Sequence, residues 1–347
     1  MLKITMNTLN ELFIDIFHQF IDPKKRIFIC YILFSIIIAF VWLIYNKKLS
    51  VKKSLKKIFN PKIFFSNSSK SDYKIFILNQ IIMFLISPIL ITQLTIATFL
   101  FYYFHSLSWL NAGMYKNSSI IVVITLFTTF HFLLDDFSKF LVHRCMHKWR
   151  VLWALHKVHH SATTLTPMTV FRTHPLEGII FSLRGAFTQA ITISSFVFLF
   201  GNNVDLITVL GVNIFVFLFN IFGSNLRHSH IGIRYWNWLE YILISPAQHQ
   251  VHHSVSRNHH DKNFGSALAL WDWIFGSLHH SEDTDKLTLG IGNDSSEKIH
   301  TLTNLYFKPI TEMIMMINIM INKFKDYLIK KTIIKNLIWK KNIDLHY

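Results

Sequence analysis

Residues 155–161 read LHKVHHS and residues 248–254 read QHQVHHS, so the pattern His-x-x-His-His occurs twice in this chain of 347 residues. On a helix, positions i, i+3 and i+4 lie on one face, so we expect each copy to point three imidazoles at one spot. The chain has 20 histidines, and chance alone gives about 0.07 such triplets. Because imidazole binds iron, zinc, copper and nickel, the repeat predicts a metal site rather than histidines scattered over a solvated surface.

A pair of histidines with helical spacing stands just ahead of the first copy, and it extends the set of candidate ligands. The eight candidates are His143, His147, His156, His159, His160, His249, His252 and His253. A lone zinc ion takes three or four protein ligands. Eight histidines therefore fit two ions with open coordination positions.

The type of ligand limits the chemistry of such a site. Two nearby metals with mostly neutral ligands favour O₂ chemistry, because a pair of redox-active irons can activate oxygen. Metal-assisted hydrolysis at a two-metal site is the alternative, but dinuclear hydrolases usually need bridging carboxylates, and no acidic residue lies inside the motifs. The Glu-x-x-His pairs of soluble di-iron bundles are missing from the motifs as well.

The composition indicates a membrane protein. Hydrophobic residues make up 51% of the chain, and the mean hydropathy is +0.35. Apolar runs of the length that spans a bilayer predict a mostly α-helical protein with four or five membrane helices, at about Ile27–Tyr45, Ile75–Phe104, Ile120–Val142, Gly178–Phe200 and Leu206–Phe222. Pro88 falls inside the second run and is expected to kink or split it.

The net charge of +16 is concentrated beside these apolar runs, in residues 47–62 and 323–341. Lysines in such positions set membrane topology and attract anionic lipids, and no nucleic-acid-binding motif accompanies them, so we expect no nucleic-acid partner. With residues 47–62 in the cytoplasm, the alternation of spans delivers both histidine regions to the cytoplasmic face. Residues 310–339 fit either an interfacial amphipathic helix or a poorly ordered basic tail.

At these motifs the chain resembles the fatty acid hydroxylase and sterol desaturase family of integral membrane oxygenases. The resemblance rests on five segments, which are DDFSKFLVHRCMHKWRVLWALHKVHHS (135–161), FRTHPLE (171–177), RHSHIGI (227–233), ISPAQHQVHHS (244–254) and DKNFGSALALWDWIFGSL (261–278). It implies membrane helices with a cytoplasmic histidine-rich helical cap that holds a dinuclear metal site. We expect membrane spans and a basic cytoplasmic loop in residues 1–118, the catalytic domain in 119–300 and a basic amphipathic tail in 301–347.

The resemblance assigns metal binding to the eight candidates and implies a ninth ligand between the two halves. His228 matches that position best and His230 competes with it, because residues two apart cannot share one helical face. His174 is a further candidate, as a ligand or as a residue beside the ligands, and Asp136 is expected to orient a ligand ring. The pairs His259–His260 and His279–His280 are interpreted as solvated loop residues.

The expected function is O₂-dependent hydroxylation or desaturation of a lipid alkyl chain or a sterol. The resemblance implies two iron ions, with zinc as a substitute, and O₂ as the oxidant. No flavin, NAD or haem motif is visible, so we expect a separate electron-transfer protein to supply the electrons. The other expected partner is the membrane bilayer. A membrane zinc-dependent lipid hydrolase and a non-enzymatic metal transporter or sensor are the alternatives.

Overall fold

The computed structural model describes residues 6–86, 93–201, 204–292 and 297–343, and helices dominate these segments, which confirms a mostly α-helical fold. The α-helices are α1 Met6–Ile21, α2 Ile29–Tyr45, α3 Val51–Ile58, α4 Pro61–Phe64, α5 Asn67–Ile86, α6 Gln93–Ser106, α7 Ile120–Lys148, α8 Arg150–His160, α9 Pro175–Phe200, α10 Ile214–Phe219, α11 Asn225–Arg227, α12 Pro246–His252, α13 Leu270–Ile274 and α14 Leu302–Ile343. Short 3₁₀ turns connect several of them, such as η2 Pro167–Phe171.

Two of the helices, α7 and α9, are long and apolar enough to cross a membrane, and α2 is a shorter apolar helix. The expected second span covers most of α6 and part of α5, and its Pro88 lies outside the described residues. The expected fifth span, 206–222, is not one helix. It begins with a hairpin of β1 (Thr208–Val209) and β2 (Val212–Asn213), in which Thr208 pairs with Asn213. Gly211 turns the chain with φ 73°, a conformation that glycine adopts without strain, and α10 starts only after the hairpin.

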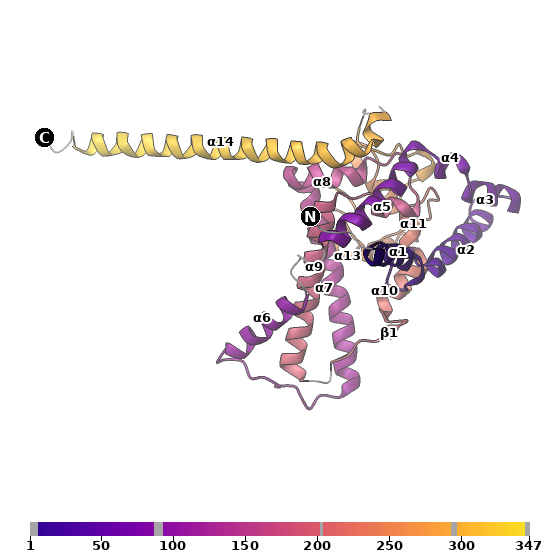
Figure 1. The fold of residues 1–347 in the computed structure, drawn as a ribbon, viewed down its shortest axis with the longest axis horizontal. Helices are drawn as coiled ribbons and strands as arrows, with labels where there is room; N and C mark the ends of the chain where they lie inside the picture. Colours follow the sequence, from indigo (N-terminus) through magenta and orange to yellow (C-terminus); the bar gives the residue numbers. More distant parts are fainter. Residues whose placement is uncertain (1–5, 87–92, 202–203, 293–296, 344–347) are drawn as a thin grey trace.

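The helices form two layers (Figure 1). Helices α6, α7 and α9 pack side by side and run away from a compact cap of shorter helices and loops. Helix α14 packs against α8 at its start, runs crosswise to α7 and α9, and then extends away from the cap. The histidine-bearing helix α8 is therefore held between the top of α7 and the start of α14.

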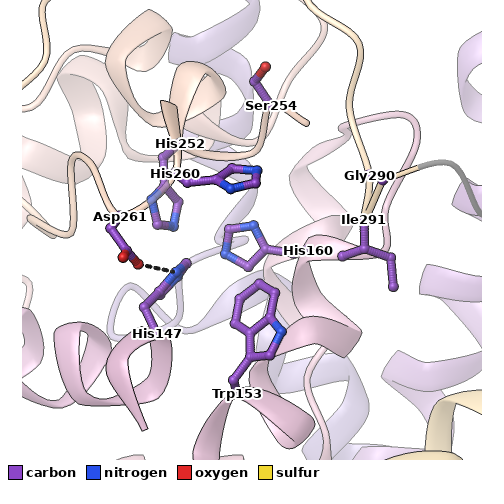
Figure 2. Close-up of a pocket in the computed structure, with 10 residues that line it drawn as sticks. His147, Trp153, His160, His252, Ser254, His260, Asp261, Gly290 and Ile291 are labelled. Carbon is purple, nitrogen blue, oxygen red and sulfur yellow. Dashed lines mark ion pairs between the residues drawn. The ribbon is translucent and has the colours of Figure 1, made fainter. Parts of the chain in front are cut away.

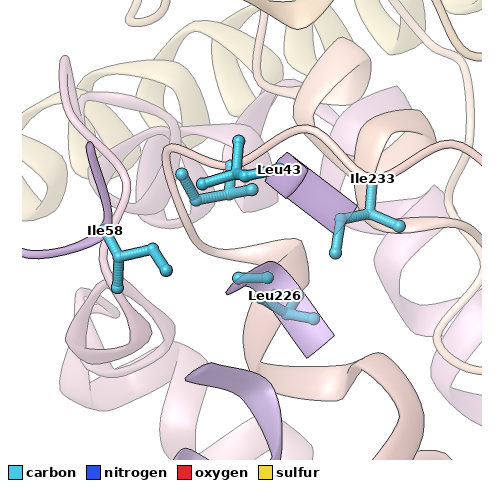
Figure 3. Packing of buried hydrophobic residues seen from close by; sticks show 6 residues of the cluster. Leu43, Ile58, Leu226 and Ile233 are labelled. Atoms are coloured by element: carbon cyan, nitrogen blue, oxygen red, sulfur yellow. The ribbon is translucent and has the colours of Figure 1, made fainter. Parts of the chain in front are cut away.

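Apolar contacts join the N-terminal helices to the cap (Figure 3). Leu43 of α2 and Ile58 of α3 pack against Leu226 and Ile233 of the cap, and each of the four is at most 5% exposed. Burial of a side chain of this size stabilises a fold by about 1.5–3 kcal/mol. The first third of the chain is thus part of the same packed unit as the histidine region.

A buried ion pair fixes the C-terminal end of α8. Arg172 and Asp72 of α5 are both 0% exposed, and their Nη1 and Oδ1 atoms are 2.9 Å apart. Asp72 also accepts a hydrogen bond from Thr169, and the Nε of Arg172 donates to the carbonyl of Val158 on α8. This network holds the α8 backbone from the side of α5, just before His159.

Candidate metal centre

Three helices place eight of the nine histidines, and the ninth, His228, follows α11 as its C-cap. His143 and His147 lie on the last two turns of α7, and a single residue, Trp149, separates α7 from α8 with the first His-x-x-His-His copy. The second copy lies on α12 and ends at its C-cap, His253. A capping box begins α12, because Ser245 and Gln248 exchange side-chain to backbone hydrogen bonds of 3.1 and 2.9 Å; such a box satisfies backbone donors that would otherwise lack partners.

All nine histidines that the sequence favours as ligands come together in the structure, in two groups of nitrogen atoms that each lie within 4.8 Å of one another. The first cluster is His143, His147, His156, His160 and His252. The second cluster is His159, His228, His249 and His253.

The expectation that each copy points at one spot is therefore wrong. From α8, His156 and His160 enter the first cluster while His159 enters the second, and from α12 the division is the reverse. The reason is helical geometry: at about 100° per residue, positions i+3 and i+4 diverge to either side of position i. Neighbouring histidines on one helix thus serve different clusters.

Outside partners hold three rings of the first cluster. The Nδ1 atoms of His143 and His252 lie 2.7 Å from the carbonyl oxygens of Phe264 and Lys262, and the Nδ1 of His156 lies 2.7 Å from the Glu177 carboxylate. The Nε2 atoms of all five histidines are buried without a hydrogen-bond partner. A buried polar atom without a partner is costly. Five such nitrogens within one small volume fit a metal ion that they would coordinate together.

In the second cluster the Nε2 atoms contact one another. His228 lies 3.0 Å from both His159 and His249, and His249 lies 3.3 Å from His253. Each Nε2 of a neutral imidazole either carries one hydrogen or accepts one, so at most two of these three contacts can be hydrogen bonds. Metal–imidazole bonds of about 2.0–2.1 Å put ligand nitrogens about 3–3.5 Å apart, and the observed spacings fit a shared cation.

The electrostatic surroundings favour neutral rings. Burial, followed by the proximity of other histidines, lowers the pKa of His159, His160, His228, His249 and His253 well below its ordinary value. Burial also lowers the pKa of His252 to about 3. Neutral imidazole is the form that binds a metal, so both clusters are ready to accept a cation at neutral pH.

The three remaining candidates lie outside both clusters. The Nε2 of His230 lies 2.7 Å from the Lys57 carbonyl, so of the two competing histidines only His228 joins a cluster. His174 caps α9, where its Nδ1 accepts from the Leu176 amide at 3.2 Å. Asp136 orients a loop instead of a ring, because it accepts the amides of Ala267 and Leu268 and the indole N–H of Trp271.

The loop that follows α12 is built around a second buried carboxylate. Asp272 accepts the amides of Phe264 and Gly265 at 2.8 and 2.6 Å, which fixes the Phe264 carbonyl against His143. A Cβ at Gly265 would lie 2.4 Å from the carbonyl oxygen of Leu268, so no larger residue fits this turn. Sequence reasoning missed this role of Asp272, since only the folded loop brings the carboxylate to those amides.

A further group lies apart from the two clusters. His259 is 4% exposed, its Nε2 is 3.3 Å from Glu282, and its ring centroid is 5.1 Å from that of His279. The interpretation of His259 as a solvated loop residue is therefore wrong. The nearby His260 is exposed, as expected.

Two cavities open beside the clusters. One, of about 330 Å³, is lined by His147, Trp153, His160 and His252 and by the loop residues Asp261 and Ile291 (Figure 2). The other, of about 300 Å³, is lined by His143, His156, His159, His228 and His249 and by Val170, Gly178 and Phe181. Small molecules can thus approach the histidines from two directions.

Comparisons with known proteins point to one family. Residues 128–277 match the family model described as Fatty acid hydroxylase. Among curated proteins, the chain is 28% identical over 160 residues to human alkylglycerol monooxygenase, which covers 46% of this chain and 32% of that protein. It is 24% identical over 163 residues to an ornithine lipid hydroxylase of Rhizobium tropici, covering 46% and 44%. It is 28% identical over 171 residues to Delta(7)-sterol 5(6)-desaturase of Saccharomyces cerevisiae, covering 49% and 40%.

The similarity is confined to part of each protein. The chain spans less than half of the length of these three relatives, and no solved structure matches it. The matched region contains all nine clustered histidines.

Proposed function

We propose that this chain, whose residues 128–277 belong to the fatty acid hydroxylase family, is a membrane enzyme that uses O₂ to hydroxylate or desaturate a lipid alkyl chain or a sterol. The observation that carries the proposal is the convergence of nine histidines, from four separate segments, into two buried clusters. The relatives are named as lipid or sterol hydroxylases and desaturases, which supports lipid oxidation as the class of reaction.

The nine histidines are proposed to hold two iron ions, one in each cluster, with zinc as a substitute. When bound, an iron pair supplies O₂ activation, which oxidation of an unactivated C–H bond requires. His228 is proposed as the ninth ligand. His230 and His174 are not, because both lie outside the two clusters. The Nε2 of His230 faces the Lys57 carbonyl, and both ring nitrogens of His174 face backbone groups.

The residues around the clusters orient the ligands and exclude water. Glu177 and the carbonyls of Phe264 and Lys262 fix the Nδ1 side of three rings, so that Nε2 faces the cluster centre. Such partners raise ligand basicity and metal affinity. The rings of Trp153 and Phe264 lie 5.0 Å from the ring of His147 and shield it from solvent.

The cavity lined by Val170, Gly178 and Phe181 is proposed as the lipid site. Gly178 and Phe181 belong to α9, one of the two helices that can cross a membrane, so an alkyl chain could approach along that helix. The cavity of Figure 2, which is lined by polar loop residues, is proposed to face the aqueous side.

The orientation in the membrane, the domain bounds and the electron donor are also proposals, and the orientation rests on the lysine distribution. The cap is proposed to face the cytoplasm, with membrane spans and a basic cytoplasmic loop in residues 1–118, the catalytic domain in residues 119–300 and a basic amphipathic tail in residues 301–347. A separate electron-transfer protein is proposed to reduce the irons, and a basic cytoplasmic surface would favour an acidic partner.

The test compares lipids from cells that express the wild-type chain with lipids from cells that express His159→Ala, analysed by mass spectrometry. We expect a lipid that gains one oxygen or loses two hydrogens only with the wild-type chain, together with O₂ uptake by the purified protein. His105→Ala is the control, because His105 is an exposed residue of α6 far from both clusters in the chain. Lipid cleavage without O₂ uptake would instead indicate a zinc hydrolase, and bound metal that exchanges freely without lipid change would indicate a transporter.

A further inference from the structure

Positive charge gathers beside the second cluster. Arg26, Lys139 and Arg227 line the cavity proposed for the lipid, and they also line a neighbouring cavity of about 190 Å³. Arg26 comes from the loop before α2, while Arg227 immediately precedes His228. The Nη2 of Arg26 lies 3.5 Å from the Nδ1 of His228, so Arg26 is in direct contact with the candidate metal centre.

The two arginines have no carboxylate partner among the described residues. Arg26 donates to the carbonyl of Ser224 and Arg227 to the carbonyl of Ser266, both of which are neutral acceptors. The Nε atoms of both arginines are buried without any partner. Arg227 is 4% exposed and its guanidinium lies 5.0 Å from the centre of the Phe219 ring. A buried charge without a counter-charge is strongly unfavourable.

The nearby carboxylates compensate these charges only in part, since Asp136 is close enough to act on Arg227 but is shared with other groups. Asp135 is already paired with Lys139 at 2.6 Å and with Arg184 at 2.8 Å, and Asp136 is occupied by three N–H donors. Around the smaller cavity, the four cations Lys24, Arg26, Lys139 and Arg227 face only these two carboxylates. Two positive charges remain, and any metal ions held by the histidines would add to them.

We propose that Arg26 and Arg227 bind the phosphate head of the lipid substrate. This inference rests on the proposed function and names the substrate class of the same site. A phosphate monoester carries about −1.5 to −2 charges at neutral pH, which matches the surplus, and guanidinium groups bind phosphate oxygens through paired N–H donors.

The position of the arginines also limits which carbon reacts. Because Arg26 contacts His228, a bound phosphate would lie next to the second cluster, with the start of the alkyl chain against Val170 and Phe181. Oxidation is therefore expected within a few bonds of the head group. A neutral sterol would leave both guanidinium groups unpaired.

The test measures binding without turnover. Purified full-length protein, with the metals it retains, is placed in nanodiscs of zwitterionic lipid and offered phosphatidic acid, diacylglycerol with the same acyl chains, or inorganic phosphate. Retained ligand is quantified by native mass spectrometry. We expect the wild-type protein to bind phosphatidic acid at least ten-fold more tightly than diacylglycerol, and we expect Arg26→Gln and Arg227→Gln each to reduce that preference at least ten-fold.

Two variants control for folding and for general charge. Arg26→Lys keeps the positive charge and should retain most of the preference, whereas Arg257→Gln removes an exposed arginine and should leave it unchanged. Equal binding of the two lipids, or a preference that survives Arg26→Gln, would overturn the proposal. Tight binding of inorganic phosphate without a lipid preference would assign the arginines to a free anion and would also overturn it. The test measures lipid binding and not oxidation. Its outcome can therefore be interpreted even if the chain does not oxidise lipids.

Discussion

The two histidine clusters are neighbours, but they are built differently. In the first, Phe264, Lys262 and Glu177 hold three rings from outside, and every Nε2 is left facing the centre. In the second, the Nε2 atoms contact one another and the Nδ1 atoms of His159, His249 and His253 have no partner. The first cluster is therefore pre-organised by the protein, whereas the geometry of the second depends on its ion and on the helix backbone behind it.

Removing one ligand from each cluster is expected to have the largest effect. His252→Ala in the first cluster and His249→Ala in the second should both abolish lipid oxidation. His249→Ala should still retain metal in the first cluster, because its anchored rings stay in place. His252→Ala should still retain metal in the second cluster, because it removes none of the four histidines of that cluster. Metal content per protein and product formation are the measurements; full turnover in either variant would contradict the assignment of these ligands.

Breaking the buried ion pair behind the second cluster should have the next largest effect. Asp72→Asn leaves Arg172 buried without a charge partner, and removing one member of such a pair typically costs about 3–5 kcal/mol. The melting temperature should fall clearly. Asp283→Asn is the matched control, since the ion pair of Asp283 with Lys47 is exposed and is expected to contribute less than about 1 kcal/mol. Equal melting temperatures for the two variants would show that the network does not support α8.

A smaller effect is expected when the first cluster loses the Glu177 carboxylate, which lies 2.7 Å from the Nδ1 of His156. Glu177→Gln keeps the size of the side chain but weakens the hold on His156, and loss of such a partner typically reduces metal affinity about 10–100-fold. Competition with a chelator measures the affinity. Glu312→Gln is the control. Glu312 of α14 pairs with Lys157 of α8, the helix that carries His156, and not with a histidine ring. If both variants release metal at the same chelator concentration, the first cluster is not pre-organised by Glu177.

The smallest effect concerns pH. Burial, followed by the charge of Arg172, lowers the pKa of His300 to about 4, below the ordinary value of 6.5. Between these values the unfolded chain binds more protons than the folded one, so stability should fall as the pH drops from about 6.5 to 4. The limit is about 1.4 kcal/mol per pH unit for one proton, and partial exposure reduces it.

The comparison of melting temperatures at pH 7 and pH 5 isolates this contribution. His300→Asn, which keeps an acceptor for Arg172, should lose less stability on acidification than the wild type. His105→Asn, which changes an exposed histidine, should behave like the wild type. The idea fails if His300→Asn and the wild type lose the same amount.

The sequence predicts the composition of the site better than its geometry. Spacing and motif select nine histidines that do gather, because i, i+3 and i+4 positions and the segments around them are local features. The division into two clusters depends on how α8 faces α12, which no local pattern contains. The choice of His228 over His230 likewise follows from a tertiary contact, since the carbonyl of Lys57 occupies His230.

Long-range contacts also explain what the sequence does not reveal. Arg26 reaches His228 across 202 positions, and Asp136 reaches Ala267 across 131. Nothing near Arg26 in the sequence marks it as part of a site. Asp136 stands beside a ligand motif, yet it serves a loop from the opposite end of the domain. The fifth expected span fails for a local reason that is easier to see in retrospect, namely the turn at Gly211.

The division of each His-x-x-His-His copy between the clusters has a mechanical consequence. His159 and His160 are adjacent, and so are His252 and His253, and in each case one residue serves each cluster. Two covalently bonded steps of the main chain, each about 3.8 Å from Cα to Cα, therefore link the two clusters. The rings can rotate, but the Cα atoms that carry them cannot move apart along the chain. The two helix backbones therefore limit how far apart the two clusters can lie, because each backbone carries a residue of both clusters.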